Sequence, residues 1–192
     1  MRVTILGSGS EGNATLVEAG GLRILVDAGF SGRSLARRLA AAEVAPESLT
    51  AIVVTHEHGD HTRGMGVLAR RFGIPLYLTA VTAHACRKLL SGDEDVRTYR
   101  PTEAFRIGAL EIQPFLTAHD AADPVAVSVT DVEGGDKLGI ATDLGRPTAA
   151  VRHALSGCHL LVLEANHDEV MLRSGPYPWS VKARIGSSHG HL

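Results

Sequence analysis

The residues from 53 to 64, VVTHEHGDHTRG, combine several metal-binding side-chain types in a very short stretch. His56, His58, Asp60 and His61 lie within six positions, directly after an apolar run. Imidazole and carboxylate groups are the ligands that zinc and similar borderline ions prefer. We therefore expect His56 and His58 to face one ion, and Asp60 and His61 to face a second. Two ions roughly 3.5–4 Å apart can stabilise the attacking and the leaving oxygen of a hydrolysis together.

Polar residues follow apolar runs at three further places, in ILVDAG, FLTAHD and GIATDLG. These sequences place Asp27, His119 and Asp143 where predicted strands end. Loops at the carboxyl ends of the strands of a rigid sheet are common positions for binding and catalytic groups. We expect Asp27 to be structural and to hold the metal loops by hydrogen bonds.

The loop GSGSEGN, which follows the first predicted strand, is rich in small residues. A dinucleotide-binding fingerprint is excluded, because a strand follows this loop where that fingerprint needs a helix. Two readings stay open, a structural turn and a loop that offers Ser8, Ser10 and Asn13 to a phosphate. His167 follows another strand end and is a further candidate site residue. The other histidines outside the motif are expected to be ordinary side chains: His84, His153, His159 and His189.

Hydrophobic periodicity predicts strands and helices along the whole chain. Strands are expected at 2–6, 51–55, 74–79, 105–118, 125–132, 137–142 and 159–166, with a hairpin at 14–29 around Gly20 and Gly21. Helices are expected at 34–44, 64–73, 83–90 and 147–156. The pattern contains no repeat, linker or low-complexity segment, so we expect one domain that mixes α and β elements.

The composition is that of an ordinary globular protein, with 192 residues, 44% hydrophobic and 21% charged. The net charge of −2 gives no overall basic character that would indicate nucleic acid, although a local basic patch stays possible. Cys86 and Cys158 are isolated thiols without a disulfide-type pattern, which favours a reducing cytoplasm. No charged leader precedes a long apolar run, and no run is long enough to span a membrane. We expect a soluble cytoplasmic protein.

The H-x-H-x-D-H motif after an apolar strand resembles that of the metallo-β-lactamase superfamily, and the resemblance extends over nearly the whole chain. It implies an α+β fold, the four-layer αββα sandwich of two mixed β-sheets flanked by helices. It also implies two divalent metal ions, zinc or manganese. His119 matches the third histidine of the family pattern, and Asp143 matches its bridging aspartate. The implied metal ligands are His56, His58, Asp60, His61, His119 and Asp143.

Within the superfamily the chain resembles the small WalJ-type hydrolases and the ribonuclease Z branch. The segments that carry this resemblance are LGSGSEGNATLVE, HDEVMLRSGPYPWSVKARI and GHL. The resemblance implies a phosphodiesterase or nuclease that acts on DNA or RNA through a metal-bound hydroxide. Asp60 would orient that hydroxide, and Glu164 and His191 would lie near the leaving group. A thioester or lactone hydrolase of the glyoxalase II type is the alternative, although no extra helical substrate domain is recognisable. The diiron oxygen-reducing branch fits poorly, because it has a glutamate where this chain has His58.

The family pattern includes a seventh ligand, a histidine beyond the bridging aspartate. His191 is one candidate, but GHL resembles an earlier phosphate-site motif of the family. The sequence therefore leaves two alternatives, a missing ligand or His191 in that role. If the ligand is missing, residues 1–192 form a single domain that is truncated at its C-terminus. Such a chain would be a weakly active or inactive metal-binding fragment. Such a chain is expected to hold one metal firmly and the second weakly.

Overall fold

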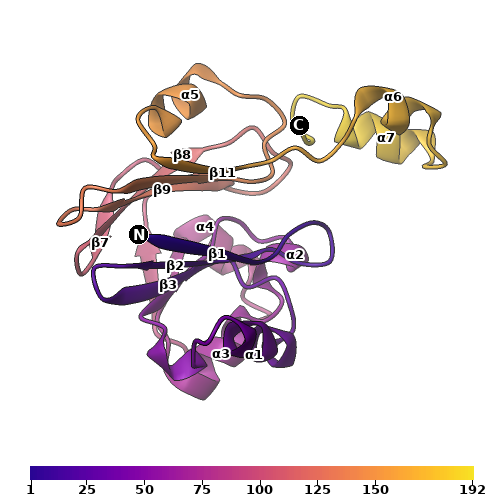
Figure 1. The fold of residues 1–192 in the computed structure, drawn as a ribbon. Coiled ribbons are helices and arrows are strands. Elements are labelled where there is room, and N and C mark those ends of the chain that lie inside the picture. Colours follow the sequence, from indigo (N-terminus) through magenta and orange to yellow (C-terminus); the bar gives the residue numbers. More distant parts are fainter.

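Two β-sheets are stacked face to face in the computed structural model, which describes residues 1–192. Helices cover the outer faces of both sheets, as Figure 1 shows. This is the four-layer arrangement that the resemblance implied. None of the helices combines the length and the apolar character that crossing a bilayer requires.

The first sheet contains six strands in the order of the chain. They are β1 (Arg2–Gly7), β2 (Ala14–Ala19), β3 (Leu22–Val26), β4 (Ala51–Val53), β5 (Leu76–Thr79) and β6 (Val96–Tyr99). The first three strands are antiparallel, and β3 to β6 are parallel. Gly20 and Gly21 form the turn between β2 and β3 with φ angles of 56° and 72°, a conformation that glycine adopts at little cost. Because β3 and β4 are parallel, their carboxyl ends meet at one edge of the sheet.

The second sheet contains five strands in the order β11-β10-β9-β8-β7. They are β7 (Phe105–Ile107), β8 (Leu110–Leu116), β9 (Val125–Asp131), β10 (Lys137–Ala141) and β11 (Leu160–Leu163). β8 and β10 both pair antiparallel with β9, so these two strands run in the same direction. β11 is parallel to β10 and forms the edge of the sheet.

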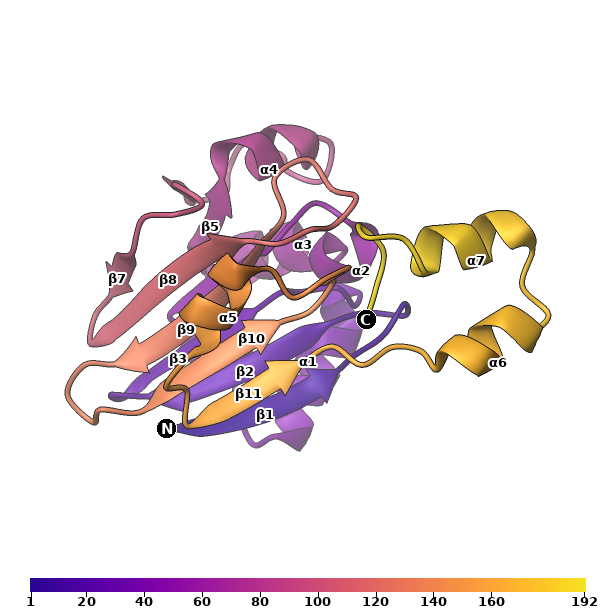
Figure 2. The ribbon, with the colours of Figure 1, turned by 90° about the horizontal axis from the view of Figure 1, so that it is seen from above.

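Seven α-helices complete the fold. They are α1 (Gly32–Ala41), α2 (Gly59–Thr62), α3 (Met65–Phe72), α4 (Ala80–Ala85), α5 (Ala149–Leu155), α6 (Glu169–Ser174) and α7 (Trp179–Ile185). Figure 1 shows α1 and α3 against the first sheet and α5 against the second. Figure 2 shows that α6 and α7 project from the sandwich as an arm, residues 167–189, after which the C-terminus returns to the body.

Three apolar cores separate the four layers. Leu25 and Ile52 belong to the core between the first sheet and its helices. Their neighbours Ile24 and Val53 face the other way and pack in the core between the two sheets. This alternation follows from the two-residue repeat of a strand, and it explains why the central strands are apolar on both faces. A third, smaller core, which includes Val151, joins α5 to the second sheet.

Most of the predicted elements are present, with differences near 34–44 and 80–99. The helix expected at 34–44 ends at Ala41, because Glu43 takes a left-handed conformation with φ of 60°. The helix expected at 83–90 instead begins at Ala80, where the Thr79 side chain caps it, and ends at Ala85. Strand β6 was not predicted, because VRTY is short and polar and lies at a sheet edge.

The strand expected at 159–166 exists, but its run of apolar residues, which is typical of a buried strand, is largely exposed. Leu160, Leu161 and Leu163 are 49%, 46% and 50% exposed. β11 has a partner only on the β10 side, so its other edge is open. Cys86 is buried, whereas Cys158 is only half-buried.

Candidate metal centre

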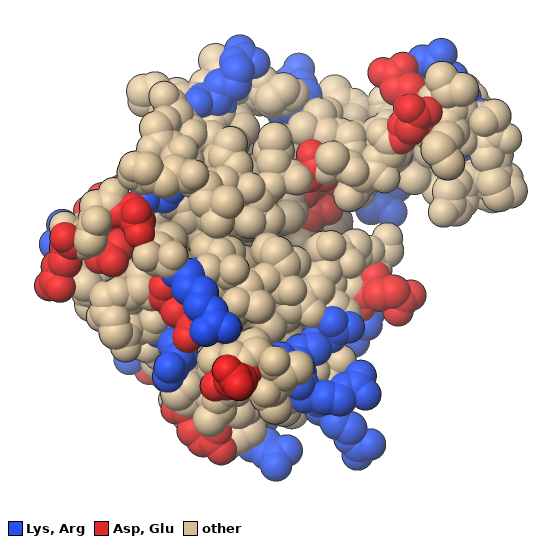
Figure 3. Space-filling model, in the orientation of Figure 1, with Lys and Arg blue, Asp and Glu red and all other residues tan.

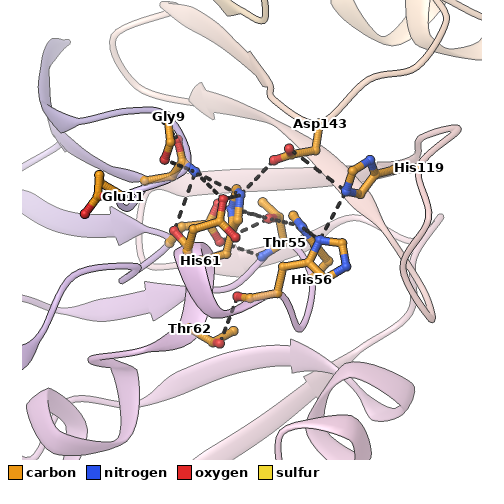
Figure 4. Close-up of polar contacts among 12 residues, drawn as sticks. Gly9, Glu11, Thr55, His56, His61, Thr62, His119 and Asp143 are labelled. Atoms are coloured by element: carbon orange, nitrogen blue, oxygen red, sulfur yellow. Dashed lines mark hydrogen bonds and ion pairs between the residues drawn. The ribbon is translucent and has the colours of Figure 1, made fainter. Parts of the chain in front are cut away.

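The side chains predicted to bind metal converge at one edge of the sandwich. Asp27 follows β3 and His56 follows β4, and the Asp27 backbone N–H donates to the Val53 carbonyl at 2.9 Å. His119 and Asp143 follow β8 and β10, which run in the same direction and therefore end at the same side. Figure 4 shows His56, His61, His119 and Asp143 pointing toward one another.

His56, His58 and His119 form the first compact group. Nδ1 of His58 lies 3.1 Å from Nε2 of His56 and 3.2 Å from Nε2 of His119. Zinc–nitrogen bonds of 2.0–2.1 Å in tetrahedral geometry place ligand nitrogens about 3.4 Å apart. Both distances are therefore close to those between ligands of one ion, and all three ligand atoms lie within 4.8 Å of one another.

The outer ring nitrogens of two of these histidines fix where their protons lie. Nδ1 of His119 lies 3.2 Å from the Gly190 carbonyl, which only accepts, so Nδ1 carries the proton. The Thr55 hydroxyl is 2.9 Å from the Asp27 carboxylate and donates to it, so it accepts from Nδ1 of His56 at 3.0 Å. Two bare Nε2 atoms thus face Nδ1 of His58, which carries at most one proton. A cation satisfies this arrangement of lone pairs better than a single proton does.

His61 and Asp143 form a second group with His56. Nε2 of His61 is 2.7 Å from Oδ2 of Asp143. That oxygen is buried and nevertheless has no hydrogen bond of acceptable geometry. On its other side, Nδ1 of His61 lies 2.8 Å from Oδ2 of Asp27. Oδ2 of Asp143 thus lies close to an imidazole without forming a hydrogen bond to it. This is the position expected of a carboxylate oxygen that shares a metal ion with the imidazole.

Charges in this cluster shift the pKa values of the two buried histidines in opposite directions. Burial, reinforced by positive charge at His61, lowers the pKa of His56 to about 2. Burial also opposes the charging of His61, but the carboxylates of Asp27 and Asp143 outweigh it and raise its pKa to about 10. Nδ1 of His61 donates to Asp27, and its Nε2 faces Asp143 and Asn13. Nε2 is therefore the ring nitrogen placed to bind a metal ion, which requires that it carry no proton.

Asp60 lies at the rim of the cluster, outside its compact groups. Its Oδ2 is 3.6 Å from Nε2 of His61. The Asn13 amide nitrogen lies 3.3 Å from the same carboxylate oxygen and 3.0 Å from Nε2 of His61. Oδ1 of Asn13 accepts from the Gly9 backbone N–H at 3.1 Å, which supports this orientation of the amide. Asn13 therefore supports the metal-binding loop, whereas Ser8 and Ser10 are exposed.

Close backbone packing brings Asn13 to this position. The Asn13 N–H donates to the Asp60 carbonyl at 2.7 Å, and the Gly29 N–H donates to the Asn13 carbonyl at 2.9 Å. A Cβ atom at Gly29 would lie 1.6 Å from the Asp60 carbonyl oxygen, so only glycine fits there. The sequence left open whether this loop is a structural turn or a phosphate-binding loop near the site, and this backbone contact was not predicted.

His191 and Glu164 lie beside Asp143. Nδ1 of His191 is 2.5 Å from Oε1 of Glu164 and 3.3 Å from Oδ1 of Asp143. Glu164 is buried, and its Oε2 accepts from the Leu144 backbone N–H at 2.5 Å. The hydrogen bond to Glu164 raises the pKa of His191. In this arrangement Nδ1 of His191 donates to carboxylates. His191 also forms a third compact group with His119 and Asp143, and it is the only histidine after Asp143 in these groups.

Comparison with known proteins identifies the family. Residues 7–170 match the metallo-beta-lactamase superfamily. The chain belongs to this superfamily. Two relatives match over the full chain. The exodeoxyribonuclease YycJ of Bacillus anthracis is 35% identical, with 73% of its length covered. The exodeoxyribonuclease WalJ of Streptococcus pneumoniae is 36% identical, with 72% covered.

A shorter match to a further protein and a likeness to a solved structure were also found. A ribonuclease Z of a Mycobacterium species is 43% identical over 75 residues, 35% of this chain and 25% of that protein. The crystal structure of Zn(2+)-bound PqqB from Methylobacterium extorquens superimposes with a TM-score of 0.78 at 18% identity, covering 100% of this chain and 81% of that one. At this identity the structural likeness shows the fold alone.

Asp27 has the structural role in this superfamily site that the sequence suggested. It is buried, and its carboxylate accepts from the Thr55 backbone N–H at 2.8 Å as well as from Thr55 and His61 side chains. Its φ of 62° is tolerated by Asn better than by Ala. In many metal sites a buried carboxylate accepts a hydrogen bond from a histidine ligand and so orients its ring.

We expect Asp27→Ala to lower the free energy of unfolding of the metal-free protein by about 3–5 kcal/mol, because it leaves His61 without its buried partner. Asp27→Asn keeps the shape and tolerates the backbone conformation, so its effect should be smaller. Urea unfolding followed by circular dichroism measures both. Equal stabilities for Asp27→Ala and the wild type would contradict the assigned role.

Proposed function

We propose that this protein is a metal-dependent phosphodiesterase that hydrolyses nucleic acid, with DNA as its first candidate substrate. The observation that carries the proposal is the hydrogen-bonded pair of Glu164 and His191 beside the candidate bridging ligand Asp143. This pair places a donor next to the cluster in addition to the metal ligands. Relatives named exodeoxyribonucleases, which match the whole chain, support the same substrate class.

Divalent ions fit the donor set. His56, His58 and His119 would hold the first ion, and His61, Asp60 and a shared Asp143 would hold the second. Zinc and manganese both accept histidine and carboxylate ligands, and the zinc-bound PqqB has the same fold. When bound, the ions lower the pKa of a coordinated water and neutralise charge that develops on the phosphate oxygens.

The chain's own residues then orient and transfer protons. Asp60 lies at the rim, where its carboxylate can accept a hydrogen bond from the attacking water; Asn13 holds it there. His191 is held by Glu164 and can donate to a phosphate oxygen or to the leaving oxygen. Proton donation of this kind typically contributes 10²–10⁴-fold to a rate. Because Glu164 is itself fixed by the Leu144 N–H, the imidazole of His191 is positioned before substrate binds.

A panel of substrates tests this function. The metal-stripped protein is reloaded with zinc or with manganese, and is offered bis(p-nitrophenyl) phosphate, a single-stranded oligodeoxynucleotide, an oligoribonucleotide, a thioester and a lactone. We expect the phosphodiesters to be cleaved and the thioester and lactone to be left intact. Efficient turnover of the thioester or lactone without phosphodiester cleavage would refute the proposal.

A further inference from the structure

A cavity of about 570 Å³ lies between the arm and the metal centre. Its walls come from α6, from α7 and from the C-terminal residues that return to the body, and His191 forms part of them. The same His191 contacts Asp143 and Glu164. A molecule that fills the cavity is therefore in contact with the residue that borders the cluster. Figure 3 shows that the arm stands clear of the rest of the molecule and carries both basic and acidic side chains.

Trp179 lines this cavity and is 80% exposed. It is the only tryptophan of the chain. Large aromatic side chains are usually buried at least in part, because their apolar surface gains most from leaving water. An indole ring in a wall of a polar cavity offers an open face on which a flat ring can stack.

Polar groups suited to a nucleotide lie around the indole. Lys182 lines the cavity, and its Nζ donates to the Arg173 carbonyl at 2.8 Å, which leaves two of its three donors free. Arg173 also lines the cavity and pairs with Glu169 at 2.7 Å. Both side chains of that pair are about three-quarters exposed, and such exposed pairs contribute little to stability, so a phosphate can displace Glu169.

His167 supplies the observation that is most difficult to explain without a ligand. Its Nδ1 is buried and has no hydrogen-bond partner. Buried polar atoms are almost always paired, and one left unpaired has a free-energy cost. His167 lines the cavity, and a rotation of its side chain would bring Nδ1 to an occupant, where a phosphate oxygen or a base oxygen can accept the missing hydrogen bond.

We propose that this cavity binds one nucleotide of a single-stranded nucleic acid, adjacent to the phosphate that is cleaved. Trp179 stacks on the base, Lys182 and Arg173 neutralise backbone phosphate, and Nδ1 of His167 donates a hydrogen bond. The inference rests on the proposed function, because the occupant is taken to be part of its substrate. One base against one indole requires an unpaired strand, so duplex should bind less well.

Some exposed apolar residues of the arm lie outside the cavity. Val170 and Met171 of α6 are 71% and 73% exposed and do not line it. A protein partner on the arm would contact this outer surface as well as Trp179. The nucleotide proposal instead requires only the cavity-lining side chains. Met171→Ala is therefore a matched control, since it removes an equally exposed side chain from the same arm.

The single tryptophan makes the test direct. The metal-stripped full chain is titrated with oligothymidylate in the presence of chelator, so that binding is measured without cleavage. We expect saturable quenching of Trp179 fluorescence by the oligonucleotide, and little quenching by an abasic oligomer of equal length or by duplex. Quenching that is absent, or equal for the abasic oligomer, would overturn the proposal.

Variants separate the contributions by fluorescence polarisation of a dye-labelled oligonucleotide. Trp179→Ala should weaken binding between about 5-fold and 100-fold, and Trp179→Phe should retain most of the affinity. His167→Ala should weaken it about 2- to 10-fold, while His167→Asn, which keeps a polar atom near the place of Nδ1, should restore it. Met171→Ala should bind as the wild type does. Unchanged binding by Trp179→Ala, or an equal loss in Met171→Ala, would refute the cavity site.

Hydrolysis of bis(p-nitrophenyl) phosphate by the metal-loaded protein keeps the two proposals distinguishable. This small diester reaches the metal centre without filling the cavity. Trp179→Ala should raise the KM for the oligonucleotide much more than the KM for this diester, and Met171→Ala should hydrolyse both substrates at the wild-type rate. If the wild type cleaved both substrates and Trp179→Ala had the wild-type KM for the oligonucleotide, the cavity proposal would be wrong. The proposed function would still hold.

Discussion

Asp60→Ala should lower phosphodiester hydrolysis by at least about 100-fold, because it removes a candidate metal ligand and the group that orients the attacking water. Loss of residues that only support the ligands already costs 10–100-fold in affinity or activity. The fold should be retained, since the Asp60 carboxylate lies at the rim and the contact to Asn13 that shapes the loop uses the Asp60 backbone. Steady-state hydrolysis of bis(p-nitrophenyl) phosphate at saturating metal measures the loss.

Asp93→Ala is the matched control for this substitution. It also removes one carboxylate, but from the exposed turn between α4 and β6. We expect its hydrolysis rate to equal that of the wild type. If Asp60→Ala kept more than a tenth of the activity at saturating metal, the role given to Asp60 would be wrong.

Metal binding by the three-histidine group should also stabilise the fold. A ligand at 1,000 times its Kd adds about 4 kcal/mol to the free energy of unfolding, which corresponds to a rise in Tm on the order of 10 °C for a protein of this size. His119→Ala deletes one of three ligands, so its Tm should be nearly the same with metal and with chelator. Thermal unfolding of both proteins under both conditions provides the comparison.

His153→Ala serves as its control. His153 is exposed on α5, away from the cluster groups. Its metal-dependent shift in Tm should match that of the wild type. A full metal-dependent shift in His119→Ala would mean that the ion is bound elsewhere.

Most strands and helices could be predicted from periodicity, because the central strands are long enough to show it, whereas the four-layer arrangement was expected from the family resemblance. In β8, the alternation of buried and half-buried residues from Leu110 to Pro114 is typical of a strand covered on one face. Strand β6 lacks such a pattern, and the exposure of β11 depends on which strand forms the sheet edge. Sheet order is a tertiary property, so the local sequence does not contain it.

His56, His58, Asp60 and His61 could be proposed as ligands from their spacing after a predicted strand. His119 and Asp143 were placed at strand ends by the sequence, and the family resemblance implied that they are ligands. The structure brings His56, His58, His61, His119 and Asp143 together, and Asp60 lies at their rim. The Asn13 contact was not predictable, because it needs the close approach of two loops at Gly29. The hydrogen bond between His119 and the Gly190 carbonyl was also not predictable, because any residue type can provide a backbone acceptor.

The geometry bears on how firmly each proposed ion would be held. His56, His58 and His119 form one compact group. The proposed second position would rely on His61, Asp60 and a shared Asp143, and His191, which is grouped with His119 and Asp143, is also hydrogen-bonded to Glu164. The two alternatives for the seventh ligand, a missing ligand or His191, thus differ in how tightly the second ion would be bound. We expect that ion to be bound more weakly than the first.

Metal titration of the stripped protein, with phosphodiester hydrolysis and bound metal measured on the same samples, tests the central claim most directly. The account predicts no hydrolysis after stripping, tight uptake of the first ion, and hydrolysis that rises as the weaker second ion binds. The same titration of His119→Ala should give neither tight uptake nor hydrolysis. Hydrolysis at the full rate in the stripped protein, or an unchanged titration curve in His119→Ala, would contradict the account.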